Sequence, residues 1–349
     1  MIEIIWLTVA NSKIQEQLRT HHNRTAHQHS SISMAPATMK IPVIDISSYL
    51  DGSNPKDVAK QIGDACEEIG FFMIKGHGIP LSLLKQVHCE ATVFFDQPLE
   101  TKQKTMAPFG LGYMGQGTEN VAATLKESTV QDQKESLNIN LPVRENVWPQ
   151  DMPSLSDTCK EYYTKVDKLA SQLMRLFALA LDLDETFFDD KVNNAFTVLR
   201  LLNYPEQPNA VAPDASQMKT MTAEHTDYGT LTILWSPDSR GLQAKSRQDK
   251  WIDVISPVDH FIINIGDLMS NWTNDKWVST LHRVVTHPET LGKRRMSLPF
   301  FHNPNPVALI ECIPGCFSED NPAKYDPIVA KEHMEMKVSK ALGKEEKMD

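Results

Sequence analysis

The sequence predicts a mixed α/β protein in which a largely helical first half precedes an antiparallel β-sandwich or barrel. Two observations lead to this prediction. Apolar residues recur at helical spacing in several stretches before residue 196, whereas short runs of Val, Ile, Thr and Leu alternate with Gly, Pro, Asn and Asp from there to residue 313. We therefore divide the chain into a leader of residues 1–40 expected to be disordered, an N-terminal region 41–195, a β-rich core 196–313 and a helical tail 314–349.

The first half is expected to alternate strands and amphipathic helices. Apolar residues spaced by three or four positions predict the helices, and short uninterrupted apolar runs predict the strands. The expected helices are residues 58–69, Leu81–Phe95 and Asp157–Leu183. The expected strands are Ile41–Ile46, Phe71–Ile74 and Glu135–Leu141. The glycine-rich stretch Pro108–Gly117 predicts a loop.

Composition and charge narrow the class of protein. The chain has 349 residues, of which 41% are hydrophobic and 23% charged, as in ordinary globular proteins. A net charge of −10 lacks the basic character of a nucleic-acid binder, so we expect no nucleic-acid partner. Every apolar run is shorter than the roughly 20 residues that span a bilayer, so we expect no membrane partner.

The cysteines and the leader bear on the compartment. Cys312 and Cys316 form a C-x3-C pair without a second Cys or His pair nearby, which argues against zinc and favours reduced thiols in the cytoplasm. The leader lacks acidic residues between Glu16 and Asp45, as an organelle transit segment does. We prefer a disordered leader, or a start at a later methionine.

The segment most informative about chemistry is His225-Thr226-Asp227. Side chains two positions apart on a strand point the same way, so a strand here would place His225 and Asp227 side by side. His282 precedes another β-rich run and supplies a third ligand in this hypothesis. Two imidazoles and one carboxylate on one side of a ferrous ion leave positions open for O2 and a co-substrate, as in non-haem iron oxygenases.

A second pair of residues suits the binding of a carboxylate. Arg295 and Ser297 also lie two positions apart on an expected strand, shortly after His282. A guanidinium group binds a carboxylate through two hydrogen bonds, and a neighbouring hydroxyl adds another donor. These residues could therefore anchor the far carboxylate of 2-oxoglutarate.

Together these motifs resemble the isopenicillin N synthase-like family of Fe(II)/2-oxoglutarate-dependent dioxygenases. The family segments H-T-D, H-R-V and R-x-S are accompanied here by IPVIDIS, GFFMIKGHGIP, LRLLNYP and RRMSLPFF, and the resemblance covers about Ile41 to Leu342. It implies a double-stranded β-helix (jelly-roll) core with flanking helices and a largely helical N-terminal region. It also implies Fe(II), 2-oxoglutarate as co-substrate, O2, and a small-molecule substrate from secondary metabolism.

Matched position by position, the resemblance assigns roles to single residues. It implies His225, Asp227 and His282 as the metal ligands. It implies Arg295, Ser297 and Tyr204 as the residues that contact 2-oxoglutarate. Many family members carry Asn two positions before that tyrosine, whereas this chain has Leu202 there and Asn203 next to it. We expect Asn203 and Phe301 to line the substrate pocket, Phe301 because it shares the strand parity of Arg295.

Three activities remain open at this point. The expected one is hydroxylation, desaturation or oxidative cyclisation of a small-molecule metabolite, with release of succinate and CO2. The first alternative is an oxidase of the same fold that omits 2-oxoglutarate, as isopenicillin N synthase and aminocyclopropane carboxylate oxidase do. The second is a non-catalytic small-molecule binder. We expect a monomer, and the substrate itself is not identified by the motifs.

Overall fold

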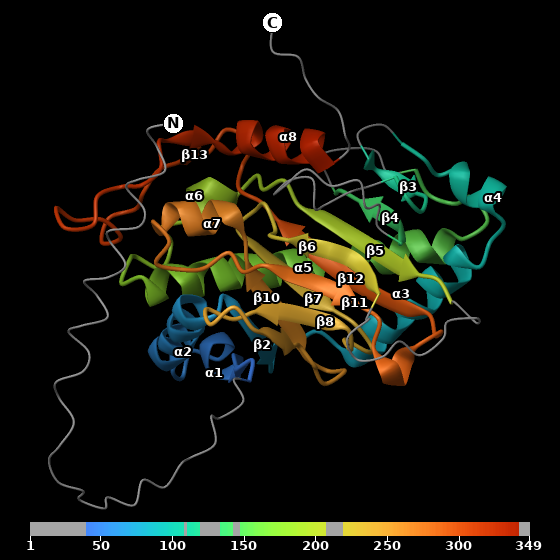
Figure 1. Ribbon diagram of the computed structural model, residues 1–349, viewed down its shortest axis with the longest axis horizontal. Helices are drawn as coiled ribbons and strands as arrows, with labels where there is room; N and C mark the ends of the chain where they lie inside the picture. The colour runs from blue at the N-terminus through green and yellow to red at the C-terminus, as the bar shows by residue number, and fades with distance from the viewer. Residues whose placement is uncertain (1–39, 108–109, 119–132, 142–146, 207–218, 342–349) are drawn as a thin grey trace, which may run out of the picture. The chain divides into compact units, whose positions relative to one another are not determined.

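An eight-stranded sheet collects strands from both halves of the sequence (Figure 1). The computed structural model describes residues 40–107, 110–118, 133–141, 147–206 and 219–341, so the prediction of a disordered leader lies outside the described residues. In spatial order the strands are β1 (Val43–Asp45), β2 (Phe71–Lys75), β10 (Phe261–Ile265), β7 (Leu231–Trp235), β12 (Arg295–His302), β5 (Val198–Tyr204), β4 (Glu135–Ile139) and β3 (Gly112–Met114). β1 pairs with β2 in parallel, and the other neighbours pair antiparallel.

A four-stranded sheet faces one side of the large sheet. Its strands, in spatial order, are β6 (Thr220–His225), β11 (His282–Val285), β8 (Leu242–Lys245) and β9 (Trp251–Asp253). Two contacts join the sheets: the hydroxyl oxygens of Tyr204 and Thr222 lie 2.8 Å apart, and the rings of Phe71 and His282 meet edge to face with centroids 5.5 Å apart. The two sheets thus form the double-stranded β-helix core that the resemblance implies.

Helices cover the opposite side of the large sheet. They are α2 (Pro55–Glu68), α3 (Leu81–Phe95) and the long α5 (Pro153–Ala180). The packing is direct, because the Tyr163 ring of α5 meets the Phe300 ring of β12 with centroids 5.0 Å apart. Local sequence defines the N-terminus of α2: the Asn54 side chain caps it by accepting a hydrogen bond from the Asp57 amide, and Pro55 occupies the first turn.

Alternation along β12 separates the helix-covered core from the space between the sheets. Leu298 and Phe300 are fully buried in the core, whereas Arg295 and Phe301 have the opposite parity. The register places Arg295 opposite Tyr204 of β5 and Phe301 opposite Thr232 of β7. Because directly opposed residues share a face, these side chains all lie toward the four-stranded sheet.

The remaining elements are short. They comprise α1 (Ser47–Leu50), α4 (Leu99–Gln103), α6 (Asp189–Val192), α7 (Asp267–Trp272), α8 (Ala330–Ala341), a 3-10 turn (Pro288–Thr290) and the hairpin of β13 (Leu309–Ile310) with β14 (Ile328–Val329). In Figure 1, α8 (red) lies at the opposite edge of the described unit from α1 and α2 (blue). No helix among the described residues combines the length and apolar character needed to cross a bilayer.

Two local expectations differ from the structure. The stretch Gly112–Met114, expected to lie in a loop, forms edge strand β3 because it pairs with β4, a tertiary contact that propensity does not reveal. Gly112 has φ +67°, and a Cβ atom there would lie 1.9 Å from the Thr105 carbonyl oxygen, so only glycine fits. Within the tail 314–349 that was expected to be helical, the helix begins only at Ala330, because Ile328–Val329 first completes the hairpin with β13.

Candidate metal centre

Three side chains with metal-ligating atoms meet between the sheets. His225 is the last residue of β6, His282 is the first residue of β11, and the two face each other in the β6–β11 register. Asp227 follows β6 in a turn, so the expectation that His225 and Asp227 share one strand is wrong. The turn nevertheless brings the carboxylate alongside, and the three ligand atoms lie within 4.8 Å of one another, the only such group among the described residues.

Hydrogen bonds to the backbone orient both imidazole rings. The Nδ1 atom of His225 lies 2.8 Å from the Ala223 carbonyl oxygen, and Nδ1 of His282 lies 3.0 Å from that of Thr280. A carbonyl oxygen only accepts, so each Nδ1 carries a proton and Nε2 is the ring atom that can face a metal ion. The Nε2 atoms of His225 and His282 lie 4.0 and 3.7 Å from Oδ1 of Asp227, respectively.

The Asp227 carboxylate is oriented by two donors that the sequence analysis missed. Its Oδ2 atom accepts hydrogen bonds from Thr232 Oγ1 at 2.5 Å and from Asn264 Nδ2 at 2.7 Å. Thr232 and Asn264 are directly opposed in the β7–β10 register, so neighbouring positions of the sheet supply both donors to the carboxylate. The sequence did contain a signal for Asn264, because it is the only polar residue in the buried strand Phe261–Ile265.

The electrostatics of the three groups suit a divalent cation. Burial and, after it, the neighbouring His282 lower the pKa of His225 to about 3, so this imidazole is neutral. Burial opposes the charge of Asp227, but the two histidines and the hydrogen bonds from Asn264 and Thr232 hold the pKa of its carboxyl below the usual value. Two imidazole nitrogens and one carboxylate oxygen therefore lie close together, and these residue types fit an iron(II) ion.

Arg295 places a buried positive charge between the sheets. Its side chain lies on the same strand face as Ser297, with Nη1 3.4 Å from the Ser297 hydroxyl, and its guanidinium lies 5.3 Å from the centre of the Tyr204 ring. Burial lowers the pKa of Arg295, but a guanidinium group remains protonated in proteins. The structure therefore brings together the three residues expected to bind the co-substrate.

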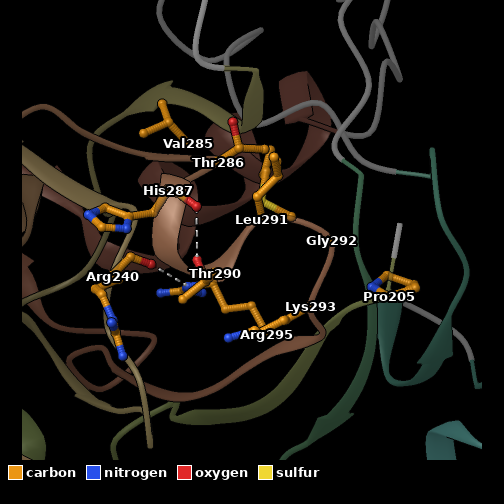
Figure 2. A pocket seen from close by; sticks show the side chains of 11 residues that line it. Pro205, Arg240, Val285, Thr286, His287, Thr290, Leu291, Gly292, Lys293 and Arg295 are labelled. Atoms are coloured by element: carbon orange, nitrogen blue, oxygen red, sulfur yellow. Dashed lines mark hydrogen bonds between the residues drawn. The ribbon is translucent and has the colours of Figure 1, made fainter. Parts of the chain in front are cut away.

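A small cavity of about 20 Å³ adjoins this guanidinium (Figure 2). Three cationic side chains line it: Arg240, Lys293 and Arg295. The other lining residues are Pro205, Met221, Val285, Thr286, His287, Thr290, Leu291 and Gly292. This end of the site therefore favours an anionic group.

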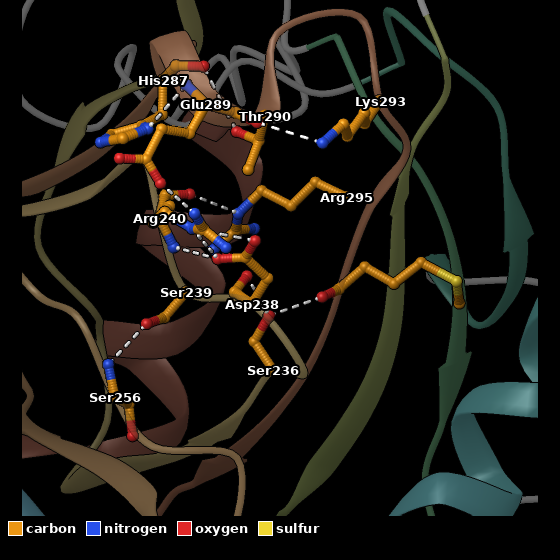
Figure 3. Close-up of polar contacts among 11 residues, drawn as sticks. Ser236, Asp238, Ser239, Arg240, Ser256, His287, Glu289, Thr290, Lys293 and Arg295 are labelled. Carbon is orange, nitrogen blue, oxygen red and sulfur yellow. Dashed lines mark hydrogen bonds and ion pairs between the residues drawn. The ribbon is translucent and has the colours of Figure 1, made fainter.

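The charge of Arg240 is neutralised, whereas that of Arg295 is not (Figure 3). Nε of Arg240 lies 2.9 and 3.1 Å from the carboxylate oxygens of Asp238, and its Nη1 pairs with Glu289. Arg295 instead donates from Nε to the backbone carbonyl of Arg240 at 3.4 Å. No carboxylate of the described residues forms an ion pair with Arg295, so this buried cation still needs an anionic partner.

The two residues expected to line a substrate pocket lie on different sides of the large sheet. Phe301 opposes Thr232, whose hydroxyl binds Asp227, so Phe301 lies on the metal side. Asn203 lies on the other side of β5 from Tyr204, and its Nδ2 donates to Glu135 Oε1 at 2.8 Å. Glu135 also pairs with Lys102 at 2.8 Å, so Asn203 belongs to a buried polar cluster of the core and is not part of the site.

Two family models match the chain. Residues 41–155 match the N-terminal region described as the non-haem dioxygenase in morphine synthesis. Residues 193–304, which include all three candidate ligands, match the 2OG-Fe(II) oxygenase superfamily. The second match ends just after β12, the strand that carries Arg295 and Ser297.

Individual relatives agree with these matches over most of their length. The 2-oxoglutarate-Fe(II) type oxidoreductase hxnY of Emericella nidulans is 32% identical over 332 residues, which cover 90% of this chain and 93% of the relative. The 1-aminocyclopropane-1-carboxylate oxidase of Dictyostelium discoideum is 31% identical over 332 residues, which cover 82% of this chain and 89% of the relative. A full-length Neurospora crassa protein solved in complex with alpha-ketoglutarate, which is 2-oxoglutarate, has a TM-score of 0.77 and 30% identity, covering 86% of this chain and 96% of that one. The same protein has also been solved with alpha-ketoglutarate and thymine, with a TM-score of 0.76.

Proposed function

The chain belongs to the 2-oxoglutarate- and iron(II)-dependent oxygenase superfamily, and from this membership we propose that His225, Asp227 and His282 hold the iron ion. The observation that carries the assignment is that both Nε2 atoms lie near Oδ1 of Asp227, at 4.0 and 3.7 Å. Bound iron(II) supplies the redox chemistry, in which O2 and 2-oxoglutarate are converted to succinate and CO2 while the substrate is oxidised. The chain's own residues orient this donor set before the metal binds.

Arg295 and Ser297 are proposed to bind the far carboxylate of 2-oxoglutarate. The buried guanidinium without a carboxylate partner among the described residues supports this role, because pairing with a dicarboxylate would relieve the cost of burying its charge. Tyr204 packs its ring against the guanidinium, and its hydroxyl is engaged with Thr222 of the opposite sheet. In this proposal Tyr204 limits how the guanidinium can turn.

The substrate is a small molecule, and we propose that it approaches along the Phe301 side of the site. Phe301 would supply an apolar wall next to the metal ligands. Arg200 has the strand parity of Tyr204 and is steadied by Asn138 Oδ1 at 2.8 Å and Ser136 Oγ at 2.9 Å. A wall that combines an aromatic ring with a guanidinium favours a planar or amphipathic substrate. A monomeric state, the absence of nucleic-acid and membrane partners, a cytoplasmic location and the four-part division of the chain stay predictions.

The test of this function is a count of products. The iron(II)-loaded protein is incubated with O2, 2-oxoglutarate and a panel of nucleobases, amino-acid derivatives and aromatic acids, and succinate is quantified against oxygen consumed. We expect one panel compound to stimulate succinate release, in proportion to oxygen uptake and to its own oxidation. The His282→Ala variant is the control and should release none.

The same experiment separates the alternative suggested by the aminocyclopropane carboxylate oxidase relative. An oxidase that omits 2-oxoglutarate would consume oxygen with its substrate and form no succinate. Oxygen uptake that is independent of 2-oxoglutarate would therefore replace the proposed role of Arg295 with binding of a carboxylate on the substrate.

A further inference from the structure

Asp267 connects the two chain segments that carry the three candidate ligands, although it is not one of them. It is the first residue of α7, and its carboxylate accepts hydrogen bonds from both segments. Oδ2 accepts from Thr226 Oγ1 at 3.2 Å, and Thr226 lies between His225 and Asp227. Oδ1 accepts from Ser279 Oγ at 2.7 Å, in the segment that leads into His282. One carboxylate therefore links both sides of the proposed metal centre.

The backbone around Asp267 brings it close to the Asp227 turn. The Asp267 amide donates to the Asp227 carbonyl oxygen at 2.8 Å, and the Gly266 amide donates to that of Thr230 at 3.0 Å. A Cβ atom at position 266 would lie 2.4 Å from the Gly229 carbonyl oxygen, so the approach requires glycine. These backbone bonds hold the Asp227 turn whatever the side chain at 267. The carboxylate adds the link to Thr226 and to the segment before His282.

A lysine from the C-terminal helix neutralises Asp267. Lys337 Nζ of α8 lies 2.8 Å from Asp267 Oδ2, and the two side chains are only 15% and 14% exposed. Its ammonium also lies 5.8 Å from the centre of the Tyr228 ring, and the buried His333 of α8 hydrogen-bonds to the Tyr228 backbone. Loss of one partner from a largely buried ion pair leaves the other charge uncompensated. The ion pair therefore couples the Asp267 carboxylate to α8.

We propose that Asp267 and Lys337 are positioning residues through which the C-terminal helix α8 sets the geometry of the metal centre. The proposal rests on the assignment of His225, Asp227 and His282 as ligands. Residues that orient metal ligands from outside the coordination shell contribute strongly to affinity. Because such coupling is reciprocal, bound metal should in turn stabilise the docking of α8.

The chain offers a matched control on the same helix. Lys331 of α8 pairs with Glu335 at 3.6 Å, but these side chains are 63% and 65% exposed, so their ion pair contributes little. Lys331→Met removes the same charge from the same helix as Lys337→Met does. Only the second substitution removes a partner of Asp267.

The experiment is a titration of Mn(II), as a redox-stable substitute for iron(II), into the metal-free full-length chain, followed by calorimetry. We expect Lys337→Met to raise the Kd for Mn(II) about tenfold and Asp267→Asn about ten- to hundredfold. Lys331→Met should have the parent's Kd for Mn(II). Lys337→Arg, which keeps the ion pair, should retain most of the parent's affinity. Amide hydrogen exchange in residues 330–341 should slow when Mn(II) binds the parent, and should slow less in Lys337→Met.

The outcomes distinguish the two proposals. A parent that fails to bind Mn(II), or a His282→Ala variant that binds it as the parent does, overturns the assignment of the metal ligands. A folded Lys337→Met variant with the parent's affinity, together with His282→Ala binding that is lost, overturns the role of α8 and leaves the metal centre standing. If Asp267→Asn does not fold, Ser279→Ala and Lys337→Met test the same link.

Discussion

The two ends of the proposed active site are built in different ways. At the metal end, the three candidate ligands come from two segments, and each ligand lies at a strand terminus or in a turn. At the carboxylate end, Arg295 and Ser297 belong to one long strand, β12, where both residues pair with β5 and pairing with β7 begins at Leu298. The first end needs side-chain links such as Asp267 to hold separate segments together. The second end is held by the sheet itself.

This difference explains where the supporting polar residues lie. Around the metal ligands, Thr232, Asn264 and Asp267 each fix a side chain or a turn. Around Arg295, the support is the Tyr204 ring and the backbone carbonyl of Arg240. Substitutions near the metal should therefore change metal affinity, and substitutions near Arg295 should change 2-oxoglutarate affinity with little effect on the metal.

The largest effect is expected from the ligands themselves. We predict that His225→Ala, Asp227→Ala and His282→Ala each weaken metal binding by more than about a hundredfold, because each removes one of three converging donors. The folds should persist, since these side chains lie outside the apolar core. Metal content after reconstitution and circular dichroism check both points. A variant that keeps the parent's metal content and turnover removes its residue from the set of ligands.

The next largest effect is expected at the other end of the site. We predict that Arg295→Leu raises the Kd for 2-oxoglutarate about ten- to a hundredfold, because a charge-assisted double hydrogen bond is lost. Arg295→Lys should recover part of the affinity, since a point charge does not reproduce the planar fork. The Kd is measured by titrating 2-oxoglutarate anaerobically into the iron(II)-loaded protein and monitoring the charge-transfer band.

The control for this prediction is metal affinity, which should be unchanged in both Arg295 variants. If Arg295→Leu binds 2-oxoglutarate like the parent but loses the primary substrate, the guanidinium serves the substrate. The two ends of the site would then bind the metal and the primary substrate, respectively.

A smaller effect is expected from Arg240, which lies behind Arg295. Its amide donates to Asp238 Oδ1 at 3.0 Å while its carbonyl accepts from Arg295, so Asp238 lies close enough to act on the charge of Arg295. Without the Arg240 side chain, Asp238 would compete with 2-oxoglutarate for Arg295. We predict that Arg240→Met weakens 2-oxoglutarate binding about three- to tenfold.

A double variant checks the cause of that effect. Asp238→Asn combined with Arg240→Met removes the competing charge and should return the affinity for 2-oxoglutarate toward that of the parent. Equal losses in the single and the double variant would show that Arg240 acts by shaping the cavity rather than by neutralising Asp238.

The smallest effect is expected from removal of the leader. Every residue assigned to either end of the site comes after Ile41, and the leader's sequence lacks apolar periodicity. A chain that begins at Met39 should keep its metal affinity, its 2-oxoglutarate affinity and its turnover within about a factor of two. Loss of soluble protein, or a larger loss at either end, would show that the leader contributes to the folded unit.

Much of the fold and site could be predicted from the sequence because the signals are local. The expected helix Leu81–Phe95 is the observed α3, because nearby residues determine both its apolar periodicity and its ends. The H-T-D and R-x-S motifs placed four functional candidates at short spacing, and the structure brings His282 to the first pair and Arg295 into contact with Ser297. By contrast, the side of the sheet on which Asn203 lies was misjudged, because Tyr204 next to it takes the opposite side and alternation allows only one of them into the site.

By itself, the sequence determined the class of fold, the donor types at the metal end and the paired cation and hydroxyl at the carboxylate end, because each follows from residue type and short-range spacing. Only the tertiary structure decided which atoms meet. The links from Asn264 to Asp227, from Thr226 to Asp267 and from Lys337 to Asp267 join residues far apart in the chain. The physical reason is that a side chain's partner across space depends on sheet register and helix docking, and these are set by packing of the whole chain rather than by any local pattern.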